Sequence, residues 1–283
     1  MNKLAVKTKE LMRRFNIHPN KRLGQNFLIE QKVLDSIIAA GDVGQDDLVI
    51  EIGPGLGTLT EELCRKAGKV IAIELDRRFI GILDDVLSEY NNYKVVQGDI
   101  LSLNLKELLG EINYQGDVKV IANLPYYITT PVIMKLLEEG TGIKSIVVMV
   151  QKEVAERITA GPGGKEYGAL TIAVAFYGLP GIVLDVPPHS FIPEPEVYSS
   201  VIRIEVQKEP PIYVKDRENF FKIVRASFSQ RRKTILNALS NSGLFGWDKP
   251  DLKQKLNSIG IVETKRPETL SISDYARIVN ELI

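Results

Sequence analysis

The feature that most constrains the fold is an alternation of short apolar runs with longer amphipathic stretches, which begins at residue 48. In the longer stretches apolar residues return every three or four positions, as they do on one face of a helix. Such alternation predicts the α/β class, with a parallel sheet that helices cover on both faces. The predicted strands are residues 48–52, 70–74, 94–96, 118–122 and 143–150, and the predicted helices include residues 58–66, 77–90 and 131–139.

The chain changes character after Glu209-Pro210-Pro211, where strand-like runs cease and helical periodicity continues to Ile283. Two earlier runs, 182–186 and 200–206, flank a proline-rich loop and predict an antiparallel hairpin at the sheet edge. We therefore predict two domains: residues 1–209 with a mostly parallel, seven-stranded sheet, and residues 210–283 built of helices alone. The remaining predicted helices cover about residues 2–16, 216–240, 249–259 and 273–282, the last with Ser273 as its N-cap.

Composition excludes several classes of protein. Hydrophobic residues make up 44% and charged residues 25% of the 283 residues, as in a soluble globular protein. No stretch approaches the roughly 20 apolar residues of a membrane span, and residues 1–22 lack the apolar core of a secretion signal. We expect a cytoplasmic monomer without a membrane partner. Cys64, His18 and His189 are too few and too scattered for a disulfide or a metal site.

The net charge is formally zero, but basic residues gather in two places. Residues 1–24 carry seven basic side chains against one acidic, and residues 222–233 carry five basic and none acidic. Local patches on a neutral protein favour a phosphate-binding surface, although solvated surface charge is the alternative for either patch. We predict RNA contacts at Arg22, Arg225, Arg231, Arg232 and Lys233.

A glycine-rich turn, Glu51–Gly57, follows the first strand and precedes a helix. Glycines let a backbone turn tightly and let a ligand approach the main chain. The spacing is G-x-G-x-G, and Thr58 stands where the dinucleotide fingerprint needs its third glycine. A G-K-[ST] ending is also absent, which excludes a P-loop on pattern. The turn alone leaves a ligand loop and a structural turn equally open.

Two acids at the ends of the next strands favour the ligand loop. Glu74 ends the second strand, where a carboxylate can accept hydrogen bonds from two ribose hydroxyls. Asp99 follows the third strand and can accept a hydrogen bond from an adenine amine. Either acid singly is more often a solvated loop residue or a helix cap. Together with the turn they predict a nucleoside cofactor at the carboxyl ends of the strands.

Asn123-Leu124-Pro125-Tyr126 follows the fourth strand and combines an amide, a proline-stiffened turn and an aromatic ring. The amide oxygen can accept a hydrogen bond from an exocyclic amine, and Tyr126 can stack on a flipped-out base. The alternative is a strand-to-helix turn with a capping Asn and a buried Tyr. With the cofactor residues nearby, the stretch predicts methyl transfer to an adenine.

Several motifs in order carry a resemblance to a known family. Together they resemble the ribosomal small-subunit RNA adenine dimethyltransferases from about residue 18 to the C-terminus. The resemblance implies a class I methyltransferase sheet with a small C-terminal helical domain that binds RNA, and S-adenosylmethionine as methyl donor. It further implies N6,N6-dimethylation of two adjacent adenosines of small-subunit ribosomal RNA within an immature ribosomal particle. The motifs are residues 21–28, 51–57, 98–99, 123–126 and 191–200.

The resemblance also implies roles for single residues. Asn26 and Leu28 would contact the cofactor from a lid, and Gly53 and Gly55 would border it. Asn123 would lie between cofactor and target amine, and Phe191 would pack on the base opposite Tyr126 unless it is a loop-anchoring core residue. The rivals are the macrolide-resistance type of large-subunit ribosomal RNA adenine methyltransferase, a DNA adenine methyltransferase, an assembly factor that has lost turnover, and an NAD-dependent dehydrogenase.

Overall fold

The computed structural model describes residues 2–20, 23–230 and 232–283. These form two compact units, Met1–Ala155 with Pro180–Val206, and Glu156–Leu179 with Gln207–Ile283. The sequence prediction kept residues 156–179 with the sheet, whereas the structure groups this segment with the C-terminal helices. The assignment of separate functions to the two predicted domains remains a proposal.

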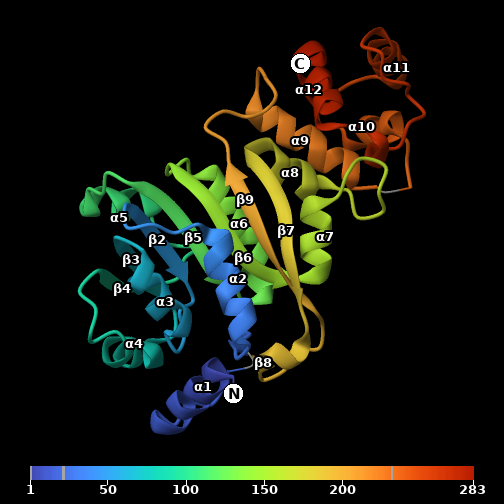
Figure 1. Ribbon diagram of the computed structural model, residues 1–283. Helices are drawn as coiled ribbons and strands as arrows, with labels where there is room; N and C mark the ends of the chain where they lie inside the picture. Colours follow the sequence, from blue (N-terminus) through green and yellow to red (C-terminus); the bar gives the residue numbers. More distant parts are fainter. Residues whose placement is uncertain (1, 21–22, 231) are drawn as a thin grey trace. The chain divides into compact units, whose positions relative to one another are not determined.

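The first unit is built on a seven-stranded sheet in the order β4-β3-β2-β5-β6-β9-β7 (Figure 1). The five strands from β4 to β6 are parallel, and β9 is antiparallel to β6. The mostly parallel, seven-stranded sheet of the prediction is thereby confirmed, with the two late strands side by side at one end. The strands are β2 (Asp47–Ile52), β3 (Lys69–Glu74), β4 (Tyr93–Gln97), β5 (Asp117–Asn123), β6 (Ile143–Gln151), β7 (Gly178–Val186) and β9 (Ser199–Val206).

Helices cover the sheet because its central strands are apolar on both faces, and every residue of β2 is buried. A single hydrophobic cluster joins the sheet to α2 (Gln31–Gly41), α3 (Thr58–Lys66) and α4 (Ile80–Val86). By contrast, α6 (Thr129–Glu138) packs against β6 without residues in that cluster, and lies behind the sheet when α2 lies in front (Figure 1). Helix α5 (Leu105–Ile112) connects β4 to β5.

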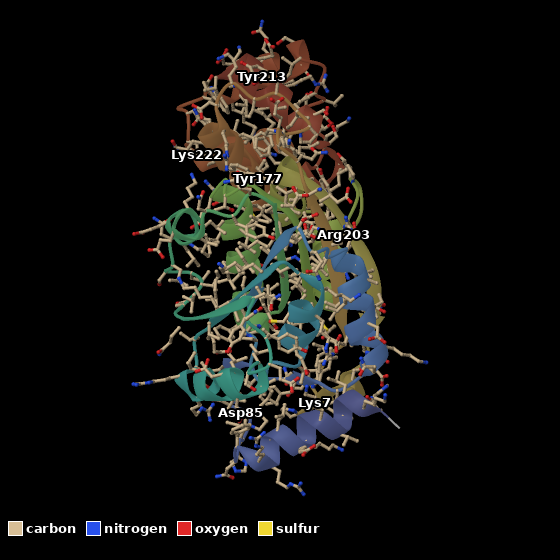
Figure 2. All side chains as sticks on the ribbon, turned by 60° about the vertical axis from the view of Figure 1, so that its left-hand side comes forward. Lys7, Asp85, Tyr177, Arg203, Tyr213 and Lys222 are labelled. Atoms are coloured by element: carbon tan, nitrogen blue, oxygen red, sulfur yellow. The ribbon has the colours of Figure 1, made fainter. Side chains whose placement is uncertain are left out.

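A short two-stranded ribbon lies apart from the main sheet. β1 (Phe27–Leu28) pairs antiparallel with β8 (Phe191–Ile192), and the Ile29 amide donates to the Ser190 carbonyl at 2.8 Å. The N-terminal helix α1 (Lys3–Arg14) packs against β1 and α2. Its ion pairs reach α3 and α4, since Lys7 pairs with Glu61 and Arg14 with Asp85; Figure 2 labels Lys7 and Asp85.

The second unit is helical: α8 (Ala169–Tyr177), α9 (Arg217–Phe228), α10 (Ile235–Ser242), α11 (Lys249–Ser258) and α12 (Ile272–Leu282). The single helix predicted over residues 216–240 is wrong. Helix α9 ends at Phe228, and Thr234 is the N-cap of a new helix, with its hydroxyl accepting from the Asn237 amide. The N-cap of α12 is Ser271 rather than Ser273, since Ser271 and Asp274 form a capping box.

Aromatic side chains fill the core of the second unit. The Phe176 ring on α8 lies 5.1 Å from that of Phe220 on α9. Tyr275 of α12 is fully buried, and its hydroxyl donates to the Pro267 carbonyl at 3.0 Å. α7 (Lys152–Thr159) spans the division between the units. Among the residues that the structure describes, no helix is long and apolar enough to cross a membrane.

Candidate active site

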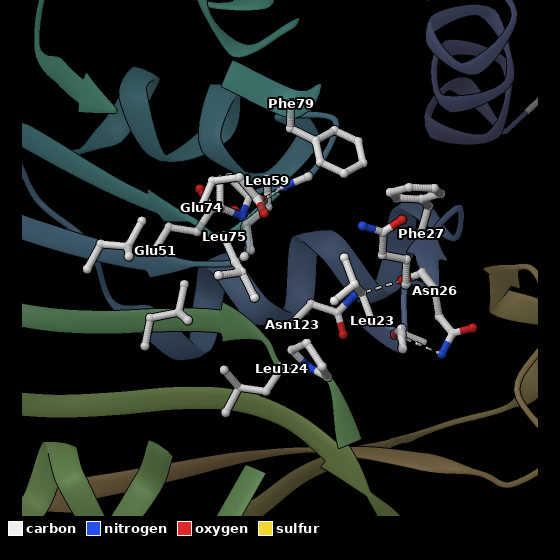
Figure 3. Close-up of a pocket in the computed structure, with 18 of the residues that line it drawn as sticks. Leu23, Asn26, Phe27, Glu51, Leu59, Glu74, Leu75, Phe79, Asn123 and Leu124 are labelled. Carbon is white, nitrogen blue, oxygen red and sulfur yellow. Dashed lines mark hydrogen bonds between the residues drawn. The ribbon is translucent and has the colours of Figure 1, made fainter. Parts of the chain in front are cut away.

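A pocket that is partly open to solvent lies where β2 to β5 end (Figure 3). In parallel α/β sheets this edge is the usual position of a ligand. The structure thus brings together side chains from five separate parts of the sequence. The predicted residues that line the pocket are Asn26, Leu28, Gly53, Gly55, Glu74, Asp99, Asn123, Leu124, Pro125 and Tyr126.

The glycines of the turn after β2 have different tasks. Gly53 has φ +70°, and a Cβ there would meet only the Asn123 carbonyl oxygen, at 4.0 Å, so the space between turn and β5 is open. At Gly55 a Cβ would lie 3.3 Å from the Phe27 ring, so glycine lets the β1 segment approach. Gly57 has φ +76° and a Cβ would meet Leu83 at 3.0 Å. Gly53 and Gly55 therefore both line the pocket, with Gly55 also admitting the β1 segment, whereas Gly57 serves packing.

Glu74 is buried at the end of β3, and backbone amides hold both of its carboxylate oxygens. Oε2 accepts from the Gly55 amide at 3.0 Å, and Oε1 accepts from the Asp76 amide at 2.8 Å. Burial raises the pKa of this carboxyl, and the two amides oppose that shift. Each oxygen retains a further lone pair, so the carboxylate can still accept from ligand hydroxyls.

Glu51 is a pocket-lining acid that the sequence analysis did not assign to the site, although it opens the glycine-rich motif. The side chain is 1% exposed. Burial raises its pKa to about 8; the nearby Thr60 side chain opposes the rise, and the charge of Glu74 adds to it. Within the described residues its Oε2 has no hydrogen-bond partner. A ligand donor placed here would relieve a desolvation cost of roughly 1 to 3 kcal/mol.

Apolar side chains accompany the two acids. Leu75 follows Glu74, Ile100 follows Asp99, and both line the pocket. Leu75 is 48% exposed, so part of its side chain is open to a ligand. Asp99 itself shapes the loop, since its Oδ1 accepts from the Leu101 amide at 2.9 Å. The sequence gives no sign of these apolar neighbours, because an apolar residue after a strand end resembles ordinary core packing, yet they can cover the face of a planar base.

The segment before β1 closes over the pocket and is fixed by side chains of distant strands. Asn123 Nδ2 donates to the Asn26 carbonyl at 3.1 Å, shown dashed in Figure 3. Gln25 Nε2 donates to Asp76 at 3.0 Å. The pKa of Asp76 falls to about 2, chiefly because Arg78 hydrogen-bonds to it. The Asn123 nitrogen is thus engaged, whereas its amide oxygen accepts from none of the described residues and can serve as an acceptor.

Tyr126 is anchored at its polar end. Its hydroxyl lies 2.6 Å from the Oγ of Ser199, which is fully buried at the start of β9. Burial raises the pKa of Tyr126, so the phenol stays neutral near pH 7. The ring lines the pocket beside Pro125, and the next residue, Tyr127, lines it as well while remaining largely exposed. An anchored, neutral ring is suited to stacking on a base.

Phe191 and the basic residues lie away from this group. The Phe191 side chain is 1% exposed in the hydrophobic cluster and does not line the pocket, although its backbone pairs with Leu28 in the β1–β8 ribbon. Its predicted contact with the target base stays a prediction. Arg225, Arg232 and Lys233 are exposed in the second unit. The predicted RNA contacts Arg22 and Arg231 lie outside the described residues.

Comparison with known proteins gives a match over most of the chain. A model of the family described as ribosomal RNA adenine dimethylase matches residues 16–283. A protein of Alkaliphilus metalliredigens named ribosomal RNA small subunit methyltransferase A is 48% identical over 98% of this chain and 96% of its own length. A protein of the same name from Clostridioides difficile is 47% identical over 96% of this chain and 94% of its own length.

Solved structures agree with this similarity. A dimethyladenosine transferase from Plasmodium falciparum superposes with a TM-score of 0.74 at 30% identity, covering 88% of this chain and 94% of its own. The 23S rRNA methyltransferase ErmE superposes with a TM-score of 0.70, covering 91% of this chain and 99% of its own. Its identity is 24%, so it supports the fold alone.

Proposed function

The chain belongs to the ribosomal RNA adenine dimethylase family, and from that premise we propose that it dimethylates N6 of two adjacent adenosines in small-subunit ribosomal RNA. The methyl donor in this proposal is S-adenosylmethionine. The observation that carries the proposal is the Asn123 side chain, whose amide oxygen accepts from no described residue, in the pocket that Gly53 also lines. This supports the proposal, because an acceptor for an amine and room for a cofactor lie in one pocket.

The pocket residues fit a nucleoside cofactor. Glu74 would accept from the two ribose hydroxyls with the lone pairs that its backbone amides leave free. Asp99 would accept from the adenine amine, with Leu75 and Ile100 against the ring. The space at Gly53 would admit the methionine part, and an ammonium group there would give the unpartnered Oε2 of Glu51 a donor. This set of acceptors suits a ligand that combines ribose, adenine and a cationic tail.

The chain's contribution to chemistry is positioning. When bound, S-adenosylmethionine supplies an electrophilic methyl group. Asn123 Oδ1 would accept from the adenine amine, hold its nitrogen in line with that methyl, and stabilise the positive charge that develops. Tyr126 would stack on the base. No general base is required, because the charged amine can release its proton to water after transfer.

Two transfers to one amine set a further demand. The pocket must accept a methyl group where a proton first lay, so Asn123 can bond to the remaining N–H of the monomethylated base. After the second transfer the amine has no N–H left to donate. The dimethylated product would therefore lose its bond to Asn123, which favours release.

The proposed partner is ribosomal RNA within an immature small-subunit particle. The enzyme is proposed to act as a monomer in the cytoplasm. Exposed basic side chains in the second unit support RNA binding, because they face solvent without an ion-pair partner among the described residues: Arg225, Arg232 and Lys233. Phosphate contacts of this kind position RNA without reading its sequence. A large-subunit target of the ErmE type has no observation in its favour beyond the shared fold.

The test is methylation of purified ribosomal subunits. Small subunits from cells that lack this modification are incubated with the protein and S-adenosylmethionine, and large subunits serve as the control. Mass spectrometry of the RNA should find two adjacent dimethyladenosines in the small-subunit RNA and none in the large. Modified large-subunit RNA, or no product from a protein that binds S-adenosylmethionine, would overturn the proposal.

A further inference from the structure

The loop of residues 243–248, between α10 and α11, presents aromatic side chains at the surface of the second unit. The rings of Phe245 and Trp247 stack with centroids 4.6 Å apart and planes 30° from parallel, and neither ring is fully buried. Gly243 and Gly246 bend the loop with φ +65° and +62°, and open space surrounds both. Leu244 is 44% exposed. An aromatic stack on an open, glycine-shaped loop offers a flat apolar face to a partner.

Basic side chains lie next to the same helix. Gln230, in the turn between α9 and α10, lies beside the end of α10, since the Asn241 side chain donates to that of Gln230 at 3.5 Å. Arg232 and Lys233 of this turn are exposed and form no ion pair with any described residue. Helix α10 has eight residues, so it is about 12 Å long. The aromatic loop and the two cations therefore flank one short helix.

The charge near the aromatic pair does not oppose an anionic partner. Lys253 and Lys255 of α11 are neutralised by Glu263 and Asp251, whereas Arg232 and Lys233 keep their charge unpaired among the described side chains. Asp248, the acid of the loop, is the N-cap residue of α11, where the helix end favours negative charge.

We propose that this surface binds an unpaired segment of ribosomal RNA, with one base stacked on the Phe245–Trp247 pair and phosphates at Arg232 and Lys233. Stacking platforms flanked by cations are how proteins hold single-stranded RNA without reading its sequence. The inference rests on the proposed function only in taking ribosomal RNA as the partner. It gives the second unit a binding mode that charge alone does not provide, because a stacked base adds an interaction that salt does not screen.

The chain carries its own probe for this contact, since Trp247 is its one tryptophan. Small-subunit RNA freed of protein has no tryptophan, so emission reports Trp247 alone. Titration with this RNA should quench the Trp247 fluorescence and protect Trp247 from quenching by acrylamide. The midpoint of this change should equal the RNA concentration at half-saturation in a filter-binding assay. Trp247→Phe should bind within about twofold of the native chain, and Trp247→Ala about tenfold more weakly, the loss expected for one stacked base.

Tyr213→Ala is the matched control, because Tyr213 is 77% exposed in the same unit (labelled in Figure 2) and should leave binding unchanged. Trp247→Leu keeps apolar bulk without a flat ring, and should resemble Trp247→Ala if that variant folds poorly. RNA that saturates the protein without changing the fluorescence would overturn the inference, as would a response to ribosomal proteins but not to RNA. Methyl transfer assayed on the same samples tests the proposed function separately.

Discussion

In the first unit, the polar side chains at the pocket are held by partners from elsewhere in the sequence, whereas Arg232 and Lys233 before α10 in the second unit have no ion-pair partner among the described residues. Asn123 is fixed to the Asn26 carbonyl, and Tyr126 to Ser199. Arg232 and Lys233 instead extend from a turn without a described ion-pair partner. The pocket side chains are therefore fixed in one conformation before a ligand binds, whereas Arg232 and Lys233 keep their conformational freedom.

The difference follows from what each region would bind. A methyl transfer tolerates little error in the position of the nucleophile, so the residues that orient it must be fixed in advance. A phosphate backbone is flexible and carries charge at every step, so mobile cations can follow it. Single substitutions should therefore have large effects at the pocket and small effects on the basic surface.

The largest effect should come from Asn123→Ala, which removes both the amine acceptor and the donor to Asn26. We expect kcat to fall by about 10² to 10³, as when other hydrogen bonds to a transition state are removed. Single-turnover assays with calorimetry for the cofactor would separate the chemical step from binding. Asn104→Ala removes only a helix N-cap outside the pocket and should leave kcat unchanged. Turnover near the native rate in the Asn123 variant would remove the residue from the mechanism.

Glu74→Ala should mainly weaken cofactor binding. It deletes the acceptor for the ribose hydroxyls and also frees the Gly55 and Asp76 amides that shape the turn. At roughly 1.5 to 3 kcal/mol for each bond to a charged acceptor, the loss is tenfold or more in Kd. Calorimetry with S-adenosylmethionine measures it, and Glu62→Ala on α3 is a surface control. An unchanged Kd would place the ribose elsewhere.

Glu51→Gln should remove a pH-dependent loss of folding stability that the buried carboxyl causes. The carboxyl titrates near 4.5 when unfolded and near 8 when folded, so it imposes no cost below pH 4.5, and stability falls as pH rises from 4.5 to 8. The variant should gain stability relative to the native chain across that window, by up to about 1.4 kcal/mol per pH unit. Urea unfolding of the cofactor-free protein at pH 5, 6.5 and 8 tests this. A difference that is the same at all three would contradict the assignment.

The smallest effect should come from the basic turn. Arg232→Ala with Lys233→Ala should weaken RNA binding modestly and flatten the dependence of log affinity on log salt by about 0.7 to 0.9 for each phosphate that the variant no longer neutralises. Cofactor affinity should stay the same. Lys208→Ala removes another exposed cation of the second unit and serves as the comparison. A salt slope equal to that of the native chain would make the turn ordinary surface.

The sequence predicted the site best at strand ends where a residue type has one clear physical role, such as a glycine in a tight turn or a carboxylate as an acceptor. The buried strands, the glycine-rich turn, Glu74 and Asp99 were all found this way, and the turn and both acids line one pocket in the structure. What sequence could not supply is the hydrogen bonding between them. That Asn123 would donate to a carbonyl 97 residues away depends on tertiary structure, and no local pattern encodes it.

The missed helices have separate reasons. Helix α8 is apolar on all sides, so it shows no periodicity that would distinguish it from a strand. The break before α10 was marked by Thr234, a good N-cap, but the surrounding residues are acceptable helix formers and hid it. Ser271 and Ser273 are both plausible caps, and the Asp three residues after Ser271 was the signal that decides between them.

The β1–β8 ribbon has a consequence for the order in which the protein is made. It pairs Phe27 with Ile192 and Leu28 with Phe191. The segment that closes the pocket is therefore synthesised about 160 residues before the strand with which it pairs. Domains fold during synthesis from the N-terminus, and β2 to β5 can assemble before residue 191 has emerged. In a nascent chain at that stage, Glu74 and Asp99 would be in place, but the segment before β1 that closes the pocket would lack its partner strand β8. On the proposed function, the chain would then bind the methyl donor tightly only after the proline-rich loop that contains β8 has been synthesised.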